Sequence, residues 1–148
     1  MCVPTPKLLV AVELLDRALS MYHQGESYFA ALHLAGAAEE IMGVYVERKG
    51  LESSFNSLQA GAVRISEILH EGAGVKPKDI IGLMNYARNR TKHINQEGDD
   101  DVHFDPKIEA IDILDRAITN FYTLMQYFDL HETENLQRFN AERAAPRE

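Results

Sequence analysis

Apolar side chains recur at alternating intervals of three and four residues along most of the chain, and this spacing limits the possible folds more than any other feature. Residues three and four apart share one face of an α-helix, so each such run predicts an amphipathic helix. The first run, Leu8 to Tyr22, follows a Thr5-Pro6 start signal and ends at Gly25. No segment alternates apolar and polar residues in the way a β-strand would. The sequence therefore predicts an all-α protein.

Four further helices are predicted from the same spacing and from residues that begin or end helices. Their expected ranges are about 26–49, before Gly50; 54–70, before Gly72 and Gly74; 77–95, opened by Pro77; and 106–130, opened by Asp105 and Pro106. Small residues crowd the second of these between Ala30 and Ala38, which would let a neighbouring helix approach closely. We expect one up-and-down bundle over residues 1–131, with four long helices and a shorter one, and a charged, disordered tail over 132–148.

Two stretches of the chain repeat one another. Ala11–Tyr22 and Ala110–Phe121 align without a gap, and an Asp-Arg-Ala triplet is identical in both. We interpret the repeat as two helices that fill similar places in the bundle, with Arg17 and Arg116 on solvated flanks. The alternative is a duplicated ligand site at the two arginines. A second polar feature, Glu39-Glu40, follows the small residues. It could make a buried polar contact to a neighbouring helix, but the favoured alternative is that at least one of the two carboxylates is simply solvated.

Composition excludes several classes of protein. The single cysteine, Cys2, allows no intramolecular disulfide and no cysteine-rich zinc site, and it fits a reducing cytoplasm. No uninterrupted apolar run is long enough to predict a membrane span. The net charge of −8 argues against a protein that coats DNA. This charge is unevenly distributed, because residues 76–92 carry five basic side chains against one acidic, whereas 97–115 carry eight acidic against one basic.

The fourth predicted helix separates an apolar face from a polar face when it is projected at about 3.6 residues per turn. The apolar face, expected to point into the core, holds Ile80, Leu83, Met84, Ala87 and Ile94. The opposite face holds Asn85, Tyr86, Asn89, Lys92 and His93. Because Asn89 and His93 are four residues apart, the amide could orient the imidazole.

Arg88 lies five residues before His93, on a different side of a straight helix. Two copies of the polar face meeting across a two-fold axis could bring Arg88 of one chain to His93 of the other. This geometry suggests a composite site in a homodimer. A polar face that is merely solvated remains the alternative.

The segment from Arg88 to His93 reads Arg-Asn-Arg-Thr-Lys-His. It resembles the R-x4-6-H motif of the HEPN superfamily (higher eukaryotes and prokaryotes nucleotide-binding), in which Asn or Asp often follows the arginine. The alanine-rich second helix that ends in glutamates, and the long helix after the motif, are also similar to HEPN domains. The resemblance covers about residues 5–130.

The resemblance implies a helical bundle that dimerises with its motifs facing each other and, in active members, a metal-independent endoribonuclease of the toxin or defence type. His93 would act as general acid or base at the ribose 2′-OH and the leaving 5′-oxygen, since imidazole titrates near neutrality. Arg88 would stabilise the transition-state charge, and Asn89 would orient His93 or contact phosphate. Arg90, Lys92 and Asn85 would bind RNA phosphates. No cofactor or metal is implied.

The resemblance also implies a possible protein partner, because some toxins of this superfamily are paired with a nucleotidyltransferase antitoxin. In some of them the antitoxin modifies a tyrosine two residues after the histidine, a position that Asn95 occupies here. Many relatives have lost activity, so a non-catalytic module that binds nucleotides or proteins is the second hypothesis. A di-iron bundle is a remote third, because Glu67 and His70 have the required spacing but no second Glu-x-x-His exists. The remaining histidines show no metal-ligand spacing: His23, His33, His103 and His131.

Overall fold

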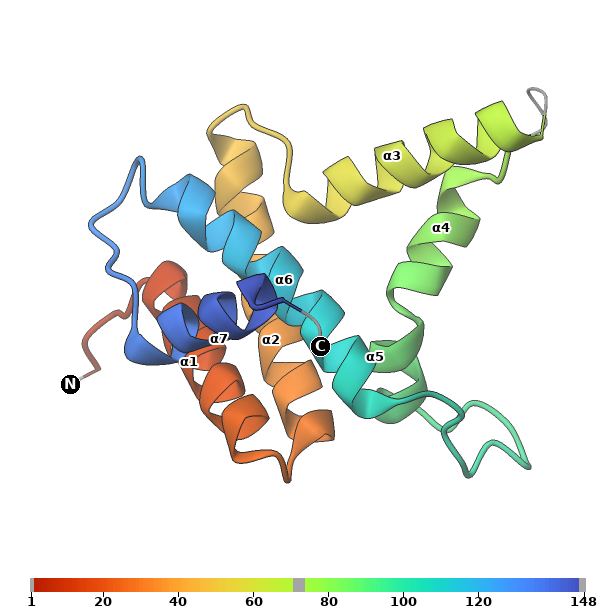
Figure 1. The fold of residues 1–148 in the computed structure, drawn as a ribbon, viewed down its shortest axis with the longest axis horizontal. Coiled ribbons are helices and arrows are strands. Elements are labelled where there is room, and N and C mark those ends of the chain that lie inside the picture. Colours follow the sequence, from red (N-terminus) through yellow and green to blue (C-terminus); the bar gives the residue numbers. More distant parts are fainter. Residues whose placement is uncertain (1, 71–73, 147–148) are drawn as a thin grey trace.

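The computed structural model describes residues 2–70 and 74–146, and within these ranges it contains helices and no strand (Figure 1). The seven helices are α1 (Lys7–Gln24), α2 (Tyr28–Arg48), α3 (Ser54–Leu69), α4 (Pro77–Met84), α5 (Tyr86–Lys92), α6 (Pro106–Leu124) and α7 (Glu134–Ala144). The all-α prediction is confirmed. Gly25 ends α1 and Gly50 follows α2, both with positive φ, as the sequence indicates. Gly72 lies outside the described residues.

The helices α1, α2 and α6 form the body of the protein and make most of its interhelical contacts. The small residues of α2 lie in this body, where Ala31, Ala35 and Ala38 are fully buried. The repeated stretches of α1 and α6 bury equivalent positions, including Leu15 and Leu114. They therefore fill similar places in the fold, as the repeat predicts.

By length and composition alone, α2 is the only helix among the described residues that could cross a bilayer. In the fold it packs against both α1 and α6. Leu32, Met42 and Val46 are buried in the core that these helices share. Packing inside the body is sufficient to account for the apolar composition of α2.

A buried ion pair crosses the body between α2 and α6. Glu39 Oε1 lies 3.0 Å from Arg116 Nε, and both residues are buried. Burial raises the pKa of Glu39, while the guanidinium of Arg116 opposes that rise. Glu39 is thus the buried polar contact that the sequence suggested, and Glu40 is exposed. The expectation of two solvated arginines is correct for Arg17 and wrong for Arg116, which Glu39 holds inside.

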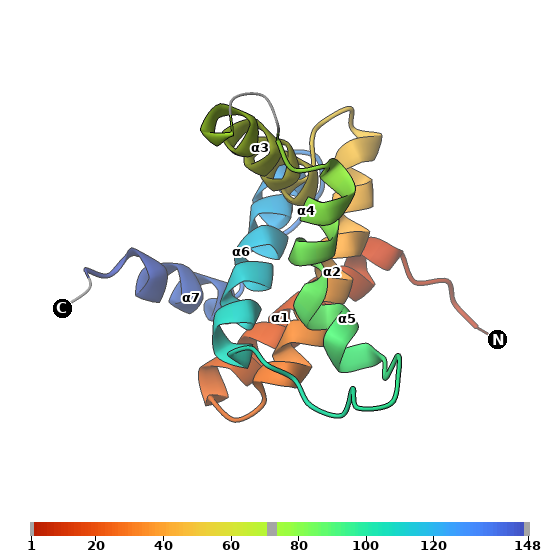
Figure 2. The ribbon, with the colours of Figure 1, turned by 90° about the vertical axis from the view of Figure 1, so that its right-hand side faces the viewer.

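The helices α3, α4 and α5 leave the body and return to it (Figure 1). In the turned view, α4 and α5 follow one another down the near face, and the loop before α6 passes below α5 (Figure 2). The main hydrophobic core takes side chains from the other helices and from Ala87 of α5, and it includes none from the described residues of α3 or α4. The helices α3 and α4 are therefore the thinly packed part of the molecule.

The prediction of one continuous helix over 77–95 is wrong, because the chain bends at Asn85 and the second helix ends at Lys92. The two parts pack on different neighbours, α4 on α3 and α5 on α2. The expected core face is divided accordingly. Ile80 and Ala87 are buried, whereas Leu83 and Ile94 are 70% and 76% exposed.

The C-terminal region also differs from the prediction. The helix α6 ends at Leu124, and the chain turns there so that Leu130 is buried. Residues 134–144 form α7 instead of a disordered tail. Leu136 and Phe139 explain this helix, since both are buried against the core and Thr133 caps it. Residues 147–148 of the tail lie outside the described part of the chain.

Candidate functional site

The R-x4-H motif lies on α5, and its two ends face different surroundings. Arg88 and Asn85 line a cavity between α2, α3 and α4, which we call the inner cavity. His93, Arg90 and Lys92 line an open groove, which we call the outer groove. The structure therefore separates residues that the sequence placed in one site.

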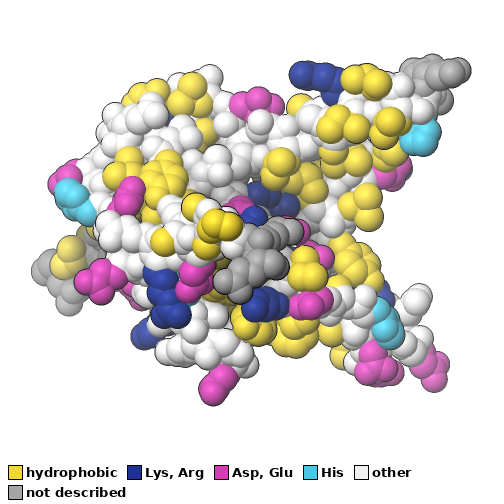
Figure 3. Space-filling view, in the orientation of Figure 1, with side chains coloured by type: hydrophobic (Ala, Val, Ile, Leu, Met, Phe, Trp, Pro, Cys, Tyr) yellow, Lys and Arg dark blue, Asp and Glu magenta, His cyan; other side chains and the backbone are white. Residues whose placement is uncertain are grey.

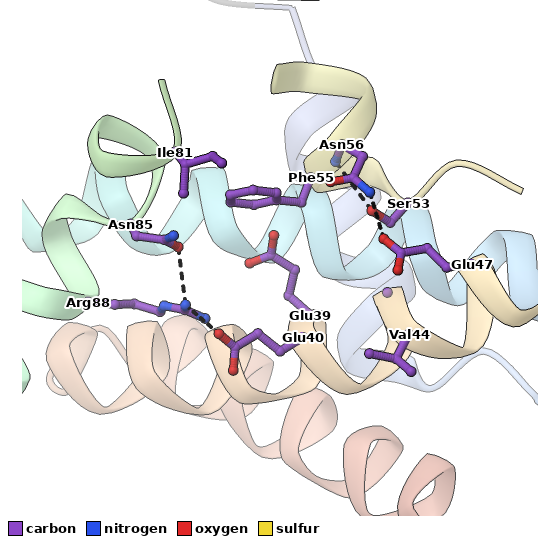
Figure 4. Close-up of a pocket in the computed structure, with 11 residues that line it drawn as sticks. Glu39, Glu40, Val44, Glu47, Ser53, Phe55, Asn56, Ile81, Asn85 and Arg88 are labelled. Carbon is purple, nitrogen blue, oxygen red and sulfur yellow. Dashed lines mark hydrogen bonds and ion pairs between the residues drawn. The ribbon is translucent and has the colours of Figure 1, made fainter. Parts of the chain in front are cut away.

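The inner cavity has a volume of about 220 Å³, and Arg88 lies at one side of it with its guanidinium between Asn85 and Glu40 (Figure 4). Arg88 Nη2 donates to Glu40 Oε1 at 2.6 Å and to Asn85 Oδ1 at 3.1 Å. Its Nη1 donates to the carbonyl of Gly36 at 3.1 Å. The side chain is only 12% exposed. These contacts tie α5 to α2 and leave Arg88 directed into the protein.

Gly36 is part of this arrangement. A Cβ added at residue 36 would collide with Cδ of Arg88, so only glycine lets the arginine lie across α2. The run of small residues in α2 therefore admits a side chain as well as neighbouring helices. The sequence pattern indicates the close approach but not which group makes it.

The outer groove has a volume of about 550 Å³ and is formed by three parts of the chain. The N-terminal half of α2 contributes Phe29 and His33, and the end of α5 contributes Lys92 and His93. The third wall is the acidic loop, Asp99–Asp101. Residues 60 positions apart in sequence thus meet at one open surface.

His33 is held against α5 by a short polar contact. Its Nε2 lies 2.6 Å from Thr91 Oγ1, and that hydroxyl is also 2.9 Å from the carbonyl of Ala87. If the hydroxyl donates its one proton to this carbonyl, it accepts from Nε2–H, and the lone pair of His33 lies on Nδ1. Burial, with Lys92 and then Arg88 nearby, lowers the pKa of His33. A neutral imidazole at pH 7 follows from that shift.

His93 follows the last residue of α5 with extended backbone angles, φ −133° and ψ 142°, and its side chain is exposed. Its contact with Asn89 is made through the backbone, because His93 N–H donates to the Asn89 carbonyl at 3.3 Å. Asn89 is also exposed. Because α5 ends at Lys92, His93 lies outside the helix, and its side chain is not placed beside that of Asn89 as it would be in a regular helix.

The acidic loop neutralises part of the basic helix. Arg90 Nη2 lies 2.8 Å from Asp99 Oδ1, and the Asp99 side chain is 3% exposed. Asp99 also accepts from the N–H of Asn95 at 3.1 Å, so it fixes the loop beside α5. Lys92 remains exposed in the groove. Asp100 and Asp101 are exposed on the facing wall.

We searched the part of the chain that the structure describes for clusters of metal-ligating side chains. No three histidine, cysteine, aspartate or glutamate side chains gather there in a way that could hold a metal ion. Glu67 and His70, the pair considered for a di-iron site, are both exposed near the end of α3. The chemistry available at the outer groove is that of imidazoles, an ammonium group and carboxylates.

Sequence reasoning missed the roles of His33 and Asp99. His33 carries no motif, and only the packing of α2 against α5 brings it to the groove. Asp99 is one of a run of acidic residues, and nothing in the sequence distinguishes the one that pairs with Arg90.

No family model, curated protein or solved structure matches this chain.

Proposed function

We propose that this chain is a HEPN-like helical protein that binds RNA at the outer groove and cleaves it without a metal ion. The observation that carries the proposal is the presence of two histidines from different helices, His33 and His93, on the walls of one open groove beside Lys92. Cleavage of RNA at a phosphodiester needs a base for the 2′-OH and an acid for the departing oxygen. Two imidazoles and a cation supply those functions.

In the proposed reaction, Nδ1 of neutral His33 accepts the proton of the ribose 2′-OH. The 2′-oxygen then attacks phosphorus, and the bond to the 5′-oxygen breaks. His93 acts as the acid and gives a proton to that oxygen, which leaves as a hydroxyl, and the phosphate remains as a 2′,3′-cyclic diester. Lys92 stabilises negative charge on the phosphoryl oxygens.

Arg88 acts in this proposal as a positioning residue. Its bonds to the Gly36 carbonyl and Glu40 hold α5 on α2, and α5 carries Lys92 and His93. The composite arrangement, in which Arg88 reaches His93 of a second chain, would require these bonds to break. Asn85 supports the same arginine, Arg90 is held by Asp99, and Asn89 remains free to contact phosphate.

We also propose that the chain works in the cytoplasm, as a homodimer that acts on RNA as a toxin or defence factor. A nucleotidyltransferase-type antitoxin is a candidate partner. The support is the resemblance of the motif and the reduced state expected for Cys2, which is exposed.

The test is cleavage of structured and unstructured RNA in EDTA by the wild type and by His93→Ala and His33→Ala. Removal of a general acid or base lowers rates by about 10²–10⁴-fold, so both variants should lose at least 100-fold. His131→Ala is the matched control, because this histidine is exposed and lies outside the groove. A wild type that cleaves none of the RNAs, or a His93→Ala variant that cleaves normally, contradicts the proposal.

A second function, a non-catalytic interaction module, is favoured by the charge pairing around α5. Two of the three cationic side chains of α5 already pair with carboxylates, Arg88 with Glu40 and Arg90 with Asp99. The exposed aspartates Asp100 and Asp101 would repel phosphate and attract a basic protein surface. RNA binding that strengthens in Asp100→Asn/Asp101→Asn favours the RNA proposal. The module predicts that the wild type binds no RNA and that this variant binds none either.

A further inference from the structure

The excursion formed by α3 and α4 exposes large apolar side chains that the body does not cover. In the space-filling view, apolar side chains gather along this part of the molecule (Figure 3). The exposed fractions are 54% for Leu58, 60% for Ile65, 73% for Ile68, 71% for Leu69 and 70% for Leu83. The only buried residue in α3 is Ser54, at its first turn.

Three of these side chains, Leu58, Ile65 and Leu69, lie on one face of α3. Positions 58, 65 and 69 are separated by seven and four residues, so they share one face of α3. This face borders a cavity of about 630 Å³ between the excursion and α6, lined by Leu58 and Ala62 of α3 and Ile80 and Met84 of α4. Ile65 and Leu69 continue the stripe beyond the residues that line the cavity. The surface is therefore an apolar groove extended by an exposed helix face.

We propose that a second copy of this chain covers the surface, with the α3–α4 excursion of each copy packed against the groove of the other. Such an arrangement is isologous, because the same patch serves both partners across a two-fold axis. Two pairs of helices then bury their apolar faces together, as in a four-helix bundle. This interface involves α3, α4 and α6 and lies apart from the composite site inferred from the motif.

Charge favours a second copy as the occupant. The whole chain carries −8, so two copies repel one another over most of their surfaces. Among residues 54–70 and 74–84, the basic side chains are Arg64, Lys76 and Lys78, against Glu67 and Asp79. This excursion therefore approaches another copy without the general repulsion.

The wall that would receive it is acidic. Asp112 and Asp115 of α6 line the cavity, and Glu109 stands one turn before Asp112. Asp115 is already paired with Arg143 at 2.7 Å. Burial, and then the charge of Asp112, raise the pKa of Glu109, while Arg116, which also lines the cavity, opposes that rise. The lysines of a partner's excursion would bring positive charge to this acidic wall.

The exposed apolar area of the excursion is a large part of the apolar area that an interface requires. At about 60–120 Å² for each Leu or Ile side chain, the exposed fractions leave roughly 300 Å² of apolar surface on the helices alone. A stable interface buries about 800 Å² per partner, of which somewhat more than half is apolar. The excursion therefore supplies a large share of that area, and the walls of the cavity add to it.

The experiment is light scattering coupled to size exclusion, on the full chain from about 1 to 300 µM, a range that covers micromolar dissociation constants. The wild type should change from monomer to dimer, and Ile65→Asp and Leu69→Asp should remain monomeric throughout. Both positions are exposed in the monomer, so circular dichroism should show unchanged helix content. Leu9→Asp is the matched control, because Leu9 is 52% exposed on α1 and adds the same charge elsewhere.

Hydrogen exchange locates the interface without any substitution. Amides of α3 and α4 should become slower to exchange as the concentration rises, while those at the solvent side of α1 should not change. A wild type that stays monomeric at 300 µM overturns the proposal. So does a dimer that persists in both aspartate variants, or protection that appears outside the excursion and its groove.

Discussion

The two ends of the R-x4-H motif occupy contrasting environments, although only four residues separate them. Arg88 lies in the inner cavity with a side chain that is 12% exposed and bound to Gly36, Glu40 and Asn85. His93 lies at the outer groove with its side chain in solvent. A charged group fixed by several partners contributes to the fold, whereas a free imidazole beside a cation is available for chemistry. Two residues of one short motif can therefore differ sharply in burial, with one fixed inside the fold and the other open to solvent.

The largest expected effect is at the buried ion pair beneath the inner cavity. Glu39→Ala should lower the free energy of unfolding by about 3–5 kcal/mol, because it leaves the guanidinium of Arg116 buried without its carboxylate. Urea unfolding at pH 7 measures this loss. Glu40→Ala is the control and should cost less than about 1 kcal/mol, since its carboxylate is 65% exposed. Equal losses of stability in the two variants would contradict the difference in burial between Glu39 and Glu40.

Arg88→Ala should cost less than Glu39→Ala but remain easily measurable. The lost bonds to the Gly36 carbonyl and Asn85 are charge-assisted and partly buried, and we expect about 1.5–3 kcal/mol. The ion pair with Glu40 adds little to the stability, because solvent screens the exposed carboxylate. The measurement is again urea unfolding, now with Arg138→Ala as control; that arginine is exposed and pairs only with Glu142 within α7. An Arg88→Ala variant as stable as the control would contradict the structural role of Arg88.

The pH dependence of stability should report His33. Its pKa is lowered in the folded protein by burial and by Lys92, so the folded state holds fewer protons than the unfolded state. The stability that the neutral ring contributes is present above the ordinary value of 6.5 and is lost as the pH falls through the folded pKa. His33→Gln should make unfolding less dependent on pH over this window. An unchanged pH profile in His33→Gln would show that the ring is not held as the structure indicates.

The smallest expected effect on stability is at the groove end of the motif. His93→Ala should change the free energy of unfolding by less than about 0.5 kcal/mol, as is usual for exposed side chains without partners. Thermal unfolding of the variant beside the wild type checks this. A loss comparable to that of Arg88→Ala would mean that His93 is a structural residue.

Local patterns predicted much of the fold. The starts of α4 and α6, the glycines after α1 and α2, and the helical class of the chain follow from residues that act over a few positions. The bend at Asn85 could not be predicted in this way, because it depends on α4 packing on α3 while Arg88 draws α5 to α2. The helix α7 was missed for a similar reason. Its two buried anchors, Leu136 and Phe139, are too few to form a pattern within a charged segment.

The sequence predicted the motif residues of the candidate site, but not the direction of Arg88 or the presence of His33. The positions of Lys92 and His93 on an accessible surface agree with the expectation from the sequence. The inward direction of Arg88 depends on Gly36, and the place of His33 depends on Thr91, each more than 50 residues away. Contacts over such sequence distances are decided by tertiary packing, which no local pattern records.

The rate of RNA cleavage in EDTA, corrected for the folded fraction, tests the division of the motif most directly. His93→Ala and Arg88→Ala are compared with the wild type at a temperature where all three are folded. We predict a loss of at least about 100-fold for His93→Ala and a loss of less than about 10-fold for Arg88→Ala, because the first removes a proton donor and the second only loosens α5. If folded Arg88→Ala is as inactive as His93→Ala, or if His93→Ala cleaves at the wild-type rate, the proposed roles of the two residues are wrong.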